Sequence, residues 1–468
     1  MLPLEPSTQE LAAMSTQLID RLLAFVEGRS EAPAADFNGV DELIRAIRVD
    51  PPERGVALDT VLDLVMAAGE KGHDTTGPGW LAYVPGGGLV TAALADLVAR
   101  VTNRFVTVWE AAPVMAEIEA TAIRWLCGLF GYDETARGVF TTGGSLANFS
   151  AIVSARHSLL GEAFLDGVLY VTSETHGSIA KAAALAGFPR ASLRLVPTTP
   201  LLQMDLGALL ELIEQDRGAG RRPCAIIASA GTTNTGAVDP IAELAQIAGV
   251  ERIWLHVDGA YGGFFQLTDR GRKLFTGIER ADSITLDPHK GMFLPYGTGA
   301  LLVRQGGELR AAHEVHGPYL QDLAPEADIP NFSDYSAELS RDARGLRVWL
   351  PIVLHGLGAF RDALNEKLDL ARYIYEALIS MPSLEVPWEP ELSIVAFRVK
   401  DGEDQASDAA TADLLRRINA TGRFVLSSTV VGGRFTIRIA VLSFRTHRDR
   451  IDELIDTISR LAPSRLHK

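Results

Sequence analysis

Two short apolar segments that end in polar or charged residues constrain this chain more than any other feature. The first runs from Trp254 to Asp258, and the second runs from Ser283 through Leu286 to Lys290. Apolar runs of this length, separated by helical stretches, indicate buried strands of a mostly parallel sheet. The loops after such strands meet at one edge of the sheet, where open α/β folds bind ligands. We therefore expect Asp258 and Lys290 to lie together at a ligand-binding edge.

The same alternation extends from about residue 115 to residue 305. Helices are expected over residues 116–129 and 146–160, and the second follows the turn Thr142-Gly143-Gly144-Ser145. The apolar runs predict six strands, over residues 168–172, 193–196, 225–229, 253–257, 283–286 and 300–303. This pattern predicts an α/β domain with a mostly parallel sheet.

The two ends of the chain have different patterns. Leu11, Leu18 and Leu22 recur at helical spacing, so short helices are expected before residue 75. Residues 76–88 are rich in glycine and proline but carry aromatic side chains, which predicts a structured loop. The last hundred residues alternate as a separate α+β unit. We divide the chain into an N-terminal helical segment (1–80), a large α/β domain (81–355) and a small C-terminal α+β domain (356–468).

Charge and cysteine content exclude several classes of function. The 468 residues carry a net charge of −15 with a pI of about 5.2, which disfavours binding to nucleic acid or to an anionic membrane. The spacing of Cys127 and Cys224 supports neither a disulfide framework nor a zinc site. We therefore expect no metal and a reducing compartment, the cytoplasm. We find no signal peptide and no stretch of the ~20 apolar residues that a membrane span requires.

Lys290 and Asp258 together suit the cofactor pyridoxal 5'-phosphate (PLP). Burial would lower the pKa of the lysine, and the neutral amine is the form that attacks an aldehyde. An aspartate that emerges from a buried strand needs a cationic partner, which a protonated pyridine ring supplies. Taken alone, Lys290 could be a surface lysine and Asp258 could cap a turn. Together they favour PLP, held by Lys290 as a Schiff base.

Three polar turns complete the candidate site. Gly144 and Ser145 begin a helix, where N–H groups attract phosphate, although such turns often only cap a helix. His176 follows a strand and could stack on a flat ring or be a bystander. Thr233 lies in a hydroxyl-rich turn that would be ordinary by itself. Their joint order, each after a candidate strand, favours one shared site.

Five motifs therefore occur in order: Gly-Gly-Ser (143–145), Glu-Thr-His (174–176), Gly-Thr-Thr (231–233), His-Val-Asp-Gly-Ala-Tyr (256–261) and Asp-Pro-His-Lys (287–290). This set resembles the group II PLP-dependent amino-acid decarboxylases, from about residue 80 to residue 445. The resemblance implies the PLP-dependent transferase fold type I, as in aspartate aminotransferase. It also implies decarboxylation of an L-amino acid by a homodimer whose active sites lie at the interface.

The resemblance implies a role for each matching residue. Lys290 would bind the PLP aldehyde, Asp258 would pair with the pyridine nitrogen, and His176 would stack on the ring. The other matches would support the ring or bind the phosphate: Thr233 the former, and Gly144, Ser145 and His289 the latter.

Tyr319 resembles the tyrosine of the family's mobile loop, which returns a proton after carbon dioxide leaves. Related aldehyde synthases carry phenylalanine there, so Tyr319 favours simple decarboxylation. An inactive paralogue should lack Lys290, Asp258 or Tyr319, and all three are present. A PLP-binding regulator would need a DNA-binding module, and no such segment is visible.

The substrate is less well specified. Trp80, Tyr83 and Pro85 match a segment that lines the substrate pocket of the aromatic enzymes, which favours an aromatic amino acid. Glutamate, 2,4-diaminobutyrate and an aldehyde synthase activity stay open as alternatives. Three positions beside the cofactor depart from many family members and weaken any transfer of substrate preference: Gly259, Asp287 and Gly291.

Overall fold

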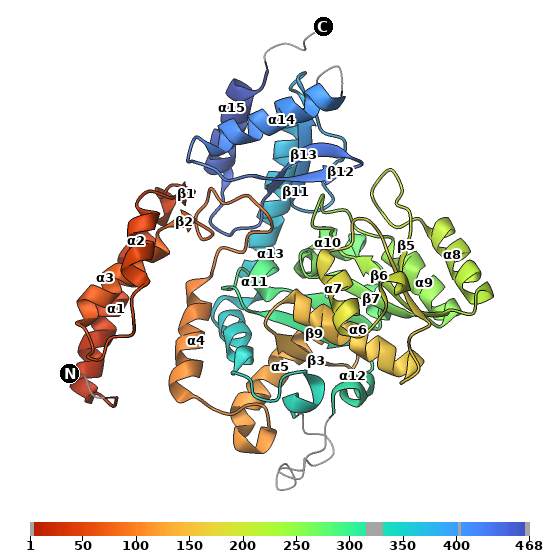
Figure 1. Cartoon of the computed structure of the whole chain (residues 1–468), viewed down its shortest axis with the longest axis horizontal. Helices are drawn as coiled ribbons and strands as arrows, with labels where there is room; N and C mark the ends of the chain where they lie inside the picture. Colours follow the sequence, from red (N-terminus) through yellow and green to blue (C-terminus); the bar gives the residue numbers. More distant parts are fainter. Residues whose placement is uncertain (1–3, 315–330, 401–403, 464–468) are drawn as a thin grey trace.

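The centre of the molecule is a seven-stranded sheet in the order β3-β9-β8-β7-β6-β4-β5 (Figure 1). The computed structural model describes residues 4–314, 331–400 and 404–463. The strands of this sheet are β3 (Arg137–Thr141), β4 (Gly167–Val171), β5 (Leu193–Leu195), β6 (Arg222–Ser229), β7 (Trp254–Gly259), β8 (Ser283–Leu286) and β9 (Gly299–Val303). Strand β9 runs antiparallel to β8 and to β3, so the other six strands point the same way. The expected mostly parallel sheet is confirmed.

Helices cover both faces of this sheet. The helices of this part of the chain are α5 (Pro113–Leu129), α6 (Gly144–Leu160), α7 (Gly177–Leu185), α8 (Leu206–Gly218), α9 (Ile241–Glu251), α10 (Asp269–Leu274), α11 (Pro288–Gly291) and α12 (Gly306–His313). Successive side chains of a strand point to opposite faces. In β4, Val168 and Tyr170 accordingly join one hydrophobic core, whereas Leu169 and Val171 join the other. Burial on both faces explains why the strand is apolar without interruption.

A smaller antiparallel sheet follows, in the order β10-β11-β13-β12. It comprises β10 (Leu384–Glu385), β11 (Ile394–Val399), β12 (Ser427–Val431) and β13 (Arg434–Ala440), with α14 (Asp404–Asn419) and α15 (Arg448–Leu461). This unit has its own hydrophobic core, to which Phe397, Leu414 and Ile451 belong.

Helix α13 (Arg344–Ile379) connects the two sheets (Figure 1). The sequence predicts a helix only around residues 346–364, and the structure extends it at both ends. The chain continues through a kink at Gly356, whose φ of 72° is a left-handed value that glycine adopts readily. The kink lies at the expected boundary of the small domain, and the division into domains stays a prediction.

The N-terminal helices lie apart from the large sheet, as Figure 1 shows for α1 (Thr8–Glu27), α2 (Val40–Ile47) and α3 (Leu58–Gly69). Two short strands, β1 (Ala35–Asp36) and β2 (Gly72–His73), pair beside them, and α4 (Val90–Thr102) follows. Helix α1 contains no buried residue. Among the residues that the structure describes, no helix has both the length and the apolar character needed to cross a membrane.

Candidate active site

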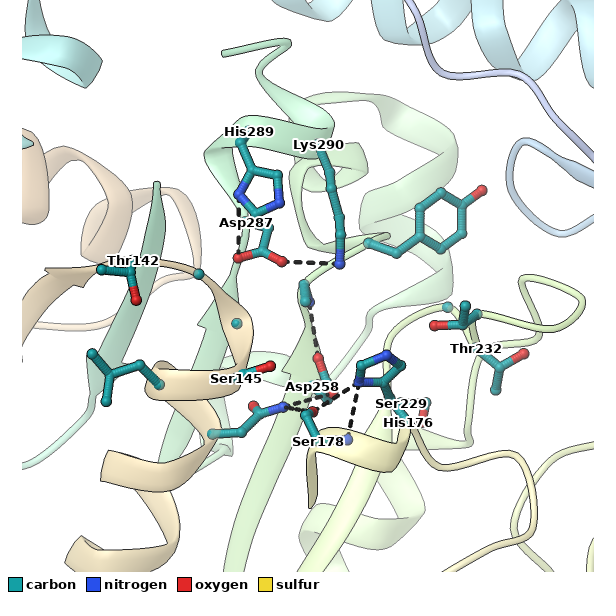
Figure 2. A pocket seen from close by; sticks show the side chains of 18 of the residues that line it. Thr142, Ser145, His176, Ser178, Ser229, Thr232, Asp258, Asp287, His289 and Lys290 are labelled. Atoms are coloured by element: carbon teal, nitrogen blue, oxygen red, sulfur yellow. Dashed lines mark hydrogen bonds and ion pairs between the residues drawn. The ribbon is translucent and has the colours of Figure 1, made fainter. Parts of the chain in front are cut away.

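A cavity of about 290 Å³ opens where the parallel strands end (Figure 2). The turns after β3, β4, β6, β7 and β8 supply most of its lining. Seven of the residues singled out in the sequence line it: Gly144, Ser145, His176, Thr233, Asp258, His289 and Lys290. The structure thus brings together side chains from five separate segments, and their individual roles stay predictions.

Lys290 reaches into the cavity from α11, a single turn that begins directly after β8. Its Nζ lies 2.9 Å from Oδ2 of Asp287, and its side chain is 20% exposed. The next residue is glycine for a steric reason, because a Cβ at Gly291 would lie 2.6 Å from the Cβ of Phe264. This departure from many family members therefore reflects close packing of α11 on the core.

Asp258 stands at the end of β7 with both carboxylate oxygens engaged. Oδ1 accepts the N–H of Ala260 at 3.1 Å, and Oδ2 accepts the side-chain amide of Asn148 at 3.0 Å. A buried carboxylate needs such donors. Asn148, on α6, was not singled out in the sequence, because an amide inside a helix belongs to no motif.

A buried chain of hydrogen bonds fixes the orientation of Asn148. Its Nδ2 donates to a carboxylate, so its Oδ1 must accept from Nε2 of His256 at 3.0 Å. Burial lowers the pKa of His256 to about 4, so the ring is neutral and its Nδ1 accepts from Ser283 Oγ at 2.8 Å. Ser283 in turn accepts from Nε1 of Trp254. The donor and the acceptor of each hydrogen bond in this series are therefore fixed, and the series ends at Asp258.

The same amide also positions His176. Asn148 Nδ2 donates to Ser178 Oγ at 2.9 Å, and Ser178 Oγ lies 2.8 Å from Nδ1 of His176 (Figure 2). The N–H of Ser178 also donates to that Nδ1, at 3.3 Å. Nδ1 is therefore an acceptor, and a neutral ring carries its proton on Nε2.

The turn at Gly143 and Gly144 begins α6, where the first N–H groups have no partner within the helix. The turn is tightly enclosed. A Cβ at Gly144 would lie 3.0 Å from Oδ2 of Asp287, and a Cβ at Gly299 would lie 2.4 Å from the carbonyl carbon of Gly143. Free N–H groups at a helix start, with no side chain in the way, suit a phosphate group.

His289 lies on the other side of this turn. Its Nδ1 is 2.7 Å from the carbonyl oxygen of Thr298. Because a carbonyl oxygen only accepts, Nδ1 carries the proton and Nε2 is left for a ligand. Burial is the main cause that lowers the pKa of His289 below its usual value.

Arg438, on β13, was also missed in the sequence and connects a cavity-lining turn to a neighbouring loop. It is buried, and burial lowers its pKa to about 10. Its guanidinium donates to the carbonyl oxygens of Thr233 and Asn234, and at 3.2 Å to that of Tyr83. The loop that carries Tyr83 is thereby held next to the turn that carries Thr233.

Among the described residues, three that the sequence singled out do not line the cavity. Trp80 is buried against Ala34 and Val425, and its ring centroid lies 5.9 Å from that of Tyr83. Tyr83 is exposed, Pro85 is buried, and the substrate-pocket assignment of all three stays a prediction. Tyr319 lies outside the described residues.

The residues present fit PLP. Lys290 offers an amine for the aldehyde, Asp258 offers a carboxylate for a ring nitrogen, and Gly144 begins a helix that attracts phosphate. Asp287 places a second carboxylate nearby, whose buried Oδ1 has no hydrogen-bond partner in the described part of the chain. The ammonium of Lys290 offsets that charge.

Comparison with known proteins agrees with this geometry. Residues 70–400 match the family described as "Pyridoxal-dependent decarboxylase conserved domain". The chain is 32% identical over 466 residues to aromatic-L-amino-acid decarboxylase from Bacillus atrophaeus, covering 98% of this chain and 97% of that protein. It is 30% identical to L-2,4-diaminobutyrate decarboxylase from Rhizobium meliloti (strain 1021), covering 91% and 86%.

A solved structure has the same architecture over almost the whole chain. The crystal structure of Oryza sativa TDC with PLP and tryptamine superposes with a TM-score of 0.91. The two share 26% identity, and the match covers 99% of this chain and 100% of that one. The fold class implied by the sequence motifs is confirmed.

Proposed function

Because this chain belongs to the pyridoxal-dependent decarboxylase family, we propose that it converts an aromatic L-amino acid to the amine and carbon dioxide. The enzyme is a carboxy-lyase with PLP as its cofactor. When bound, PLP accepts the electron pair that the α-carbon retains as carbon dioxide leaves. The protein must hold the cofactor, select the bond that breaks and return a proton.

The first two of these tasks have candidates in the cavity. Lys290 binds the cofactor through its amine, and Asp258, held by Asn148 and Ala260, keeps the ring nitrogen protonated. His176 would stack on the ring, and its Nε2–H would be a donor for the substrate carboxylate. We keep Tyr319 as the donor that returns the proton to the product.

An aromatic substrate is supported by two of the comparisons. The Bacillus atrophaeus relative is named for aromatic L-amino acids, and the rice structure contains tryptamine. L-2,4-Diaminobutyrate is the second candidate, because a relative of 30% identity is named for it. Amine release from L-tryptophan, L-tyrosine, L-phenylalanine, L-2,4-diaminobutyrate and L-glutamate, measured side by side, would discriminate between these substrates. Ammonia release with oxygen consumption would instead indicate an aldehyde synthase.

The observation that carries the proposal is the amine of Lys290 inside the cavity, opposite Asp258 at the neighbouring strand end. Lys290→Ala should abolish carbon dioxide release and the absorbance at about 420 nm expected of a lysine-bound cofactor. Lys273→Ala, which removes an exposed lysine on α10, should change neither. Full turnover and colour in the Lys290 variant would contradict the proposal.

We further propose that the enzyme is a cytoplasmic homodimer. Both cysteines, Cys127 and Cys224, are buried and unpaired, as in proteins of a reducing compartment. Several leucines of α1 are exposed although they form an apolar stripe, which a second copy of the chain could cover. The active sites would then lie at the interface.

A further inference from the structure

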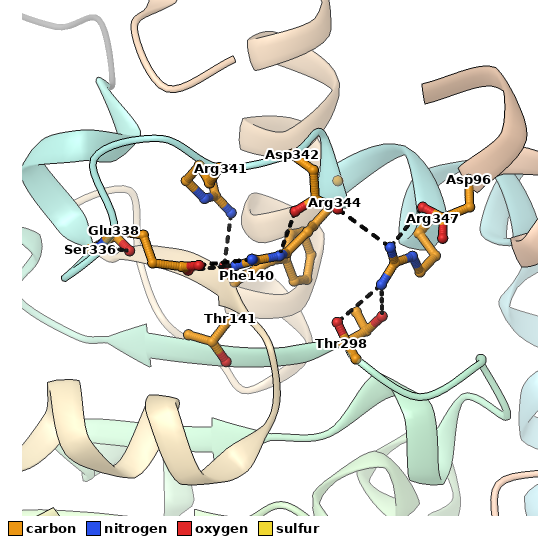
Figure 3. Close-up of polar contacts among 12 residues, drawn as sticks. Asp96, Phe140, Thr141, Thr298, Ser336, Glu338, Arg341, Asp342, Arg344 and Arg347 are labelled. Carbon is orange, nitrogen blue, oxygen red and sulfur yellow. Dashed lines mark hydrogen bonds and ion pairs between the residues drawn. The ribbon is translucent and has the colours of Figure 1, made fainter. Parts of the chain in front are cut away.

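Three arginines at three-residue spacing lie at the start of α13 (Figure 3). They are close to the turn at Gly143 and Gly144, which we propose to bind phosphate. The side chains of Arg341, Arg344 and Arg347 are 0%, 7% and 6% exposed. None of them lines the cavity. Arg341 and Arg344 both donate to the carbonyl oxygen of Phe140, at 2.8 and 3.4 Å, three residues before Gly143.

Arg347 binds the segment that packs against this turn from the start of β9. Its Nη1 donates to the carbonyl oxygen of Gly297 at 3.0 Å and to Oγ1 of Thr298 at 2.9 Å. Its Nη2 lies 2.6 Å from Oδ1 of Asp96 on α4. A buried guanidinium is costly unless it is paired in this way. The forked side chain therefore clamps residues 297 and 298 against α4.

Thr298 passes this constraint to His289. The carbonyl oxygen of Thr298 accepts Nδ1–H of His289, which fixes both the tautomer and the ring orientation. Gly299, the next residue, packs against Gly143 so closely that a Cβ would lie 2.4 Å from its carbonyl carbon. A shift of Thr298 would therefore move His289 and the helix-start turn together.

We propose that Arg347 is a positioning residue for the phosphate of PLP and acts through Thr298 on His289. The inference rests on the proposed function, because phosphate binding by His289 is part of it. Arg347 does not line the cavity. Its removal should therefore weaken binding of the phosphate group and leave the residues that contact the pyridine ring in place.

The test compares binding of PLP and of pyridoxal, which lacks the phosphate, to the apoenzyme, followed by absorbance without substrate. Arg347→Met should weaken PLP binding roughly tenfold and leave pyridoxal binding within about twofold. Arg361→Met is the matched control, because Arg361 is on the same helix and donates to the carbonyl oxygen of Leu267 at 3.0 Å. It should bind both compounds as the unaltered enzyme does.

Two variants of Thr298 test the relay if Arg347→Met fails to fold. Thr298→Val removes the hydroxyl that accepts a hydrogen bond from Arg347 and should reproduce the selective loss. Thr298→Ser keeps a hydroxyl and should bind PLP normally. Equal weakening of PLP and pyridoxal, or unchanged PLP binding in Arg347→Met or Thr298→Val, would overturn the inference. An unaltered enzyme that shows no preference for PLP over pyridoxal would instead reject the proposed phosphate site.

Discussion

The buried ring of His256 works as a neutral hydrogen-bond relay. Its pKa of about 4, lowered by burial against the opposing effect of Asp258, keeps the ring uncharged at neutral pH. A charged ring would also carry a proton on Nδ1, where Ser283 now donates. Protonation would therefore break the chain that orients Asn148 and, through it, Asp258.

This arrangement predicts a pH-dependent stability. The unfolded chain binds a proton at His256 below its ordinary pKa of 6.5, whereas the folded chain resists this down to about 4. The unfolded state therefore binds more protons in this window, and the free energy of unfolding falls as the pH is lowered. Between pH 7 and pH 5 the free energy of unfolding should fall by about 2 kcal/mol more for the unaltered enzyme than for His256→Gln. Urea unfolding at the two pH values measures the difference.

The variant is needed because other groups titrate in the same range. Burial raises the pKa of Asp239 to about 6, so that residue favours the folded state as the pH falls, opposite to His256. His256→Gln leaves Asp239 in place, and its amide can still donate to Asn148. Parallel curves for the two proteins would show that His256 is not the group responsible.

At the scale of elements, the start of α13 depends on a close approach to α5. A Cβ at Gly345 would lie 2.4 Å from both the Cα and the Cβ of Glu119, whose carboxylate accepts the N–H of Gly345 at 3.2 Å. This contact sets the position of the turn from which Arg344 and Arg347 extend.

Glycine substitutions in this one helix should have opposite effects. Gly345→Ala should destabilise the fold by about 1–3 kcal/mol, because the methyl group has no room. Gly358→Ala should stabilise it by up to about 1 kcal/mol, because nothing lies within 4 Å of the added carbon and alanine favours a helix. Thermal unfolding of both variants measures the contrast. If the two variants were destabilised equally, the contact between Gly345 and Glu119 would not be the cause of the loss.

The sequence predicted the elements whose residues are apolar without interruption. Strand β8 has the expected bounds, and β4, β6, β7 and β9 lie within a few residues of theirs. Strand β3 was missed, because its five residues include Arg137 and Gly138 and its one partner, β9, is more than 150 residues away. Strand β12 was missed as well, since it is half exposed.

Some residues of the candidate site could likewise be predicted from the sequence, and others could not. Residues that follow strands in recognisable motifs, such as Asp258 and Lys290, could be predicted because the fold brings strand ends together. Asn148, Arg347 and Arg438 could not. Each acts through a hydrogen bond to a residue distant in sequence, and no local pattern specifies that partner.

At the scale of the whole molecule, the segment from α1 to α3 (residues 8–69), here called the N-terminal arm, is the part that is hardest to explain for a single copy of the chain. Leu11, Leu18 and Leu22 lie on one face of α1 at helical spacing and are 47%, 37% and 40% exposed. The arm contacts the rest of the chain at a few points, among them the hydrogen bond from Arg450 to the carbonyl oxygen of Ser30. An apolar stripe of this kind is expected to be covered in solution.

In the homodimer that we propose, a charge within this stripe should therefore separate the two copies. Leu22→Asp would bury an unpaired carboxylate at the interface, which should weaken dimerisation at least roughly hundredfold and lower decarboxylase activity with it. Leu210→Asp is the matched control, because Leu210 is 44% exposed on α8, far from the arm in Figure 1. Sedimentation equilibrium with activity measured at the same concentrations compares them. If the unaltered enzyme sediments as a monomer with full activity, both the dimer and the interfacial active site are wrong. If Leu22→Asp stays dimeric, the copies meet elsewhere than on the face of α1.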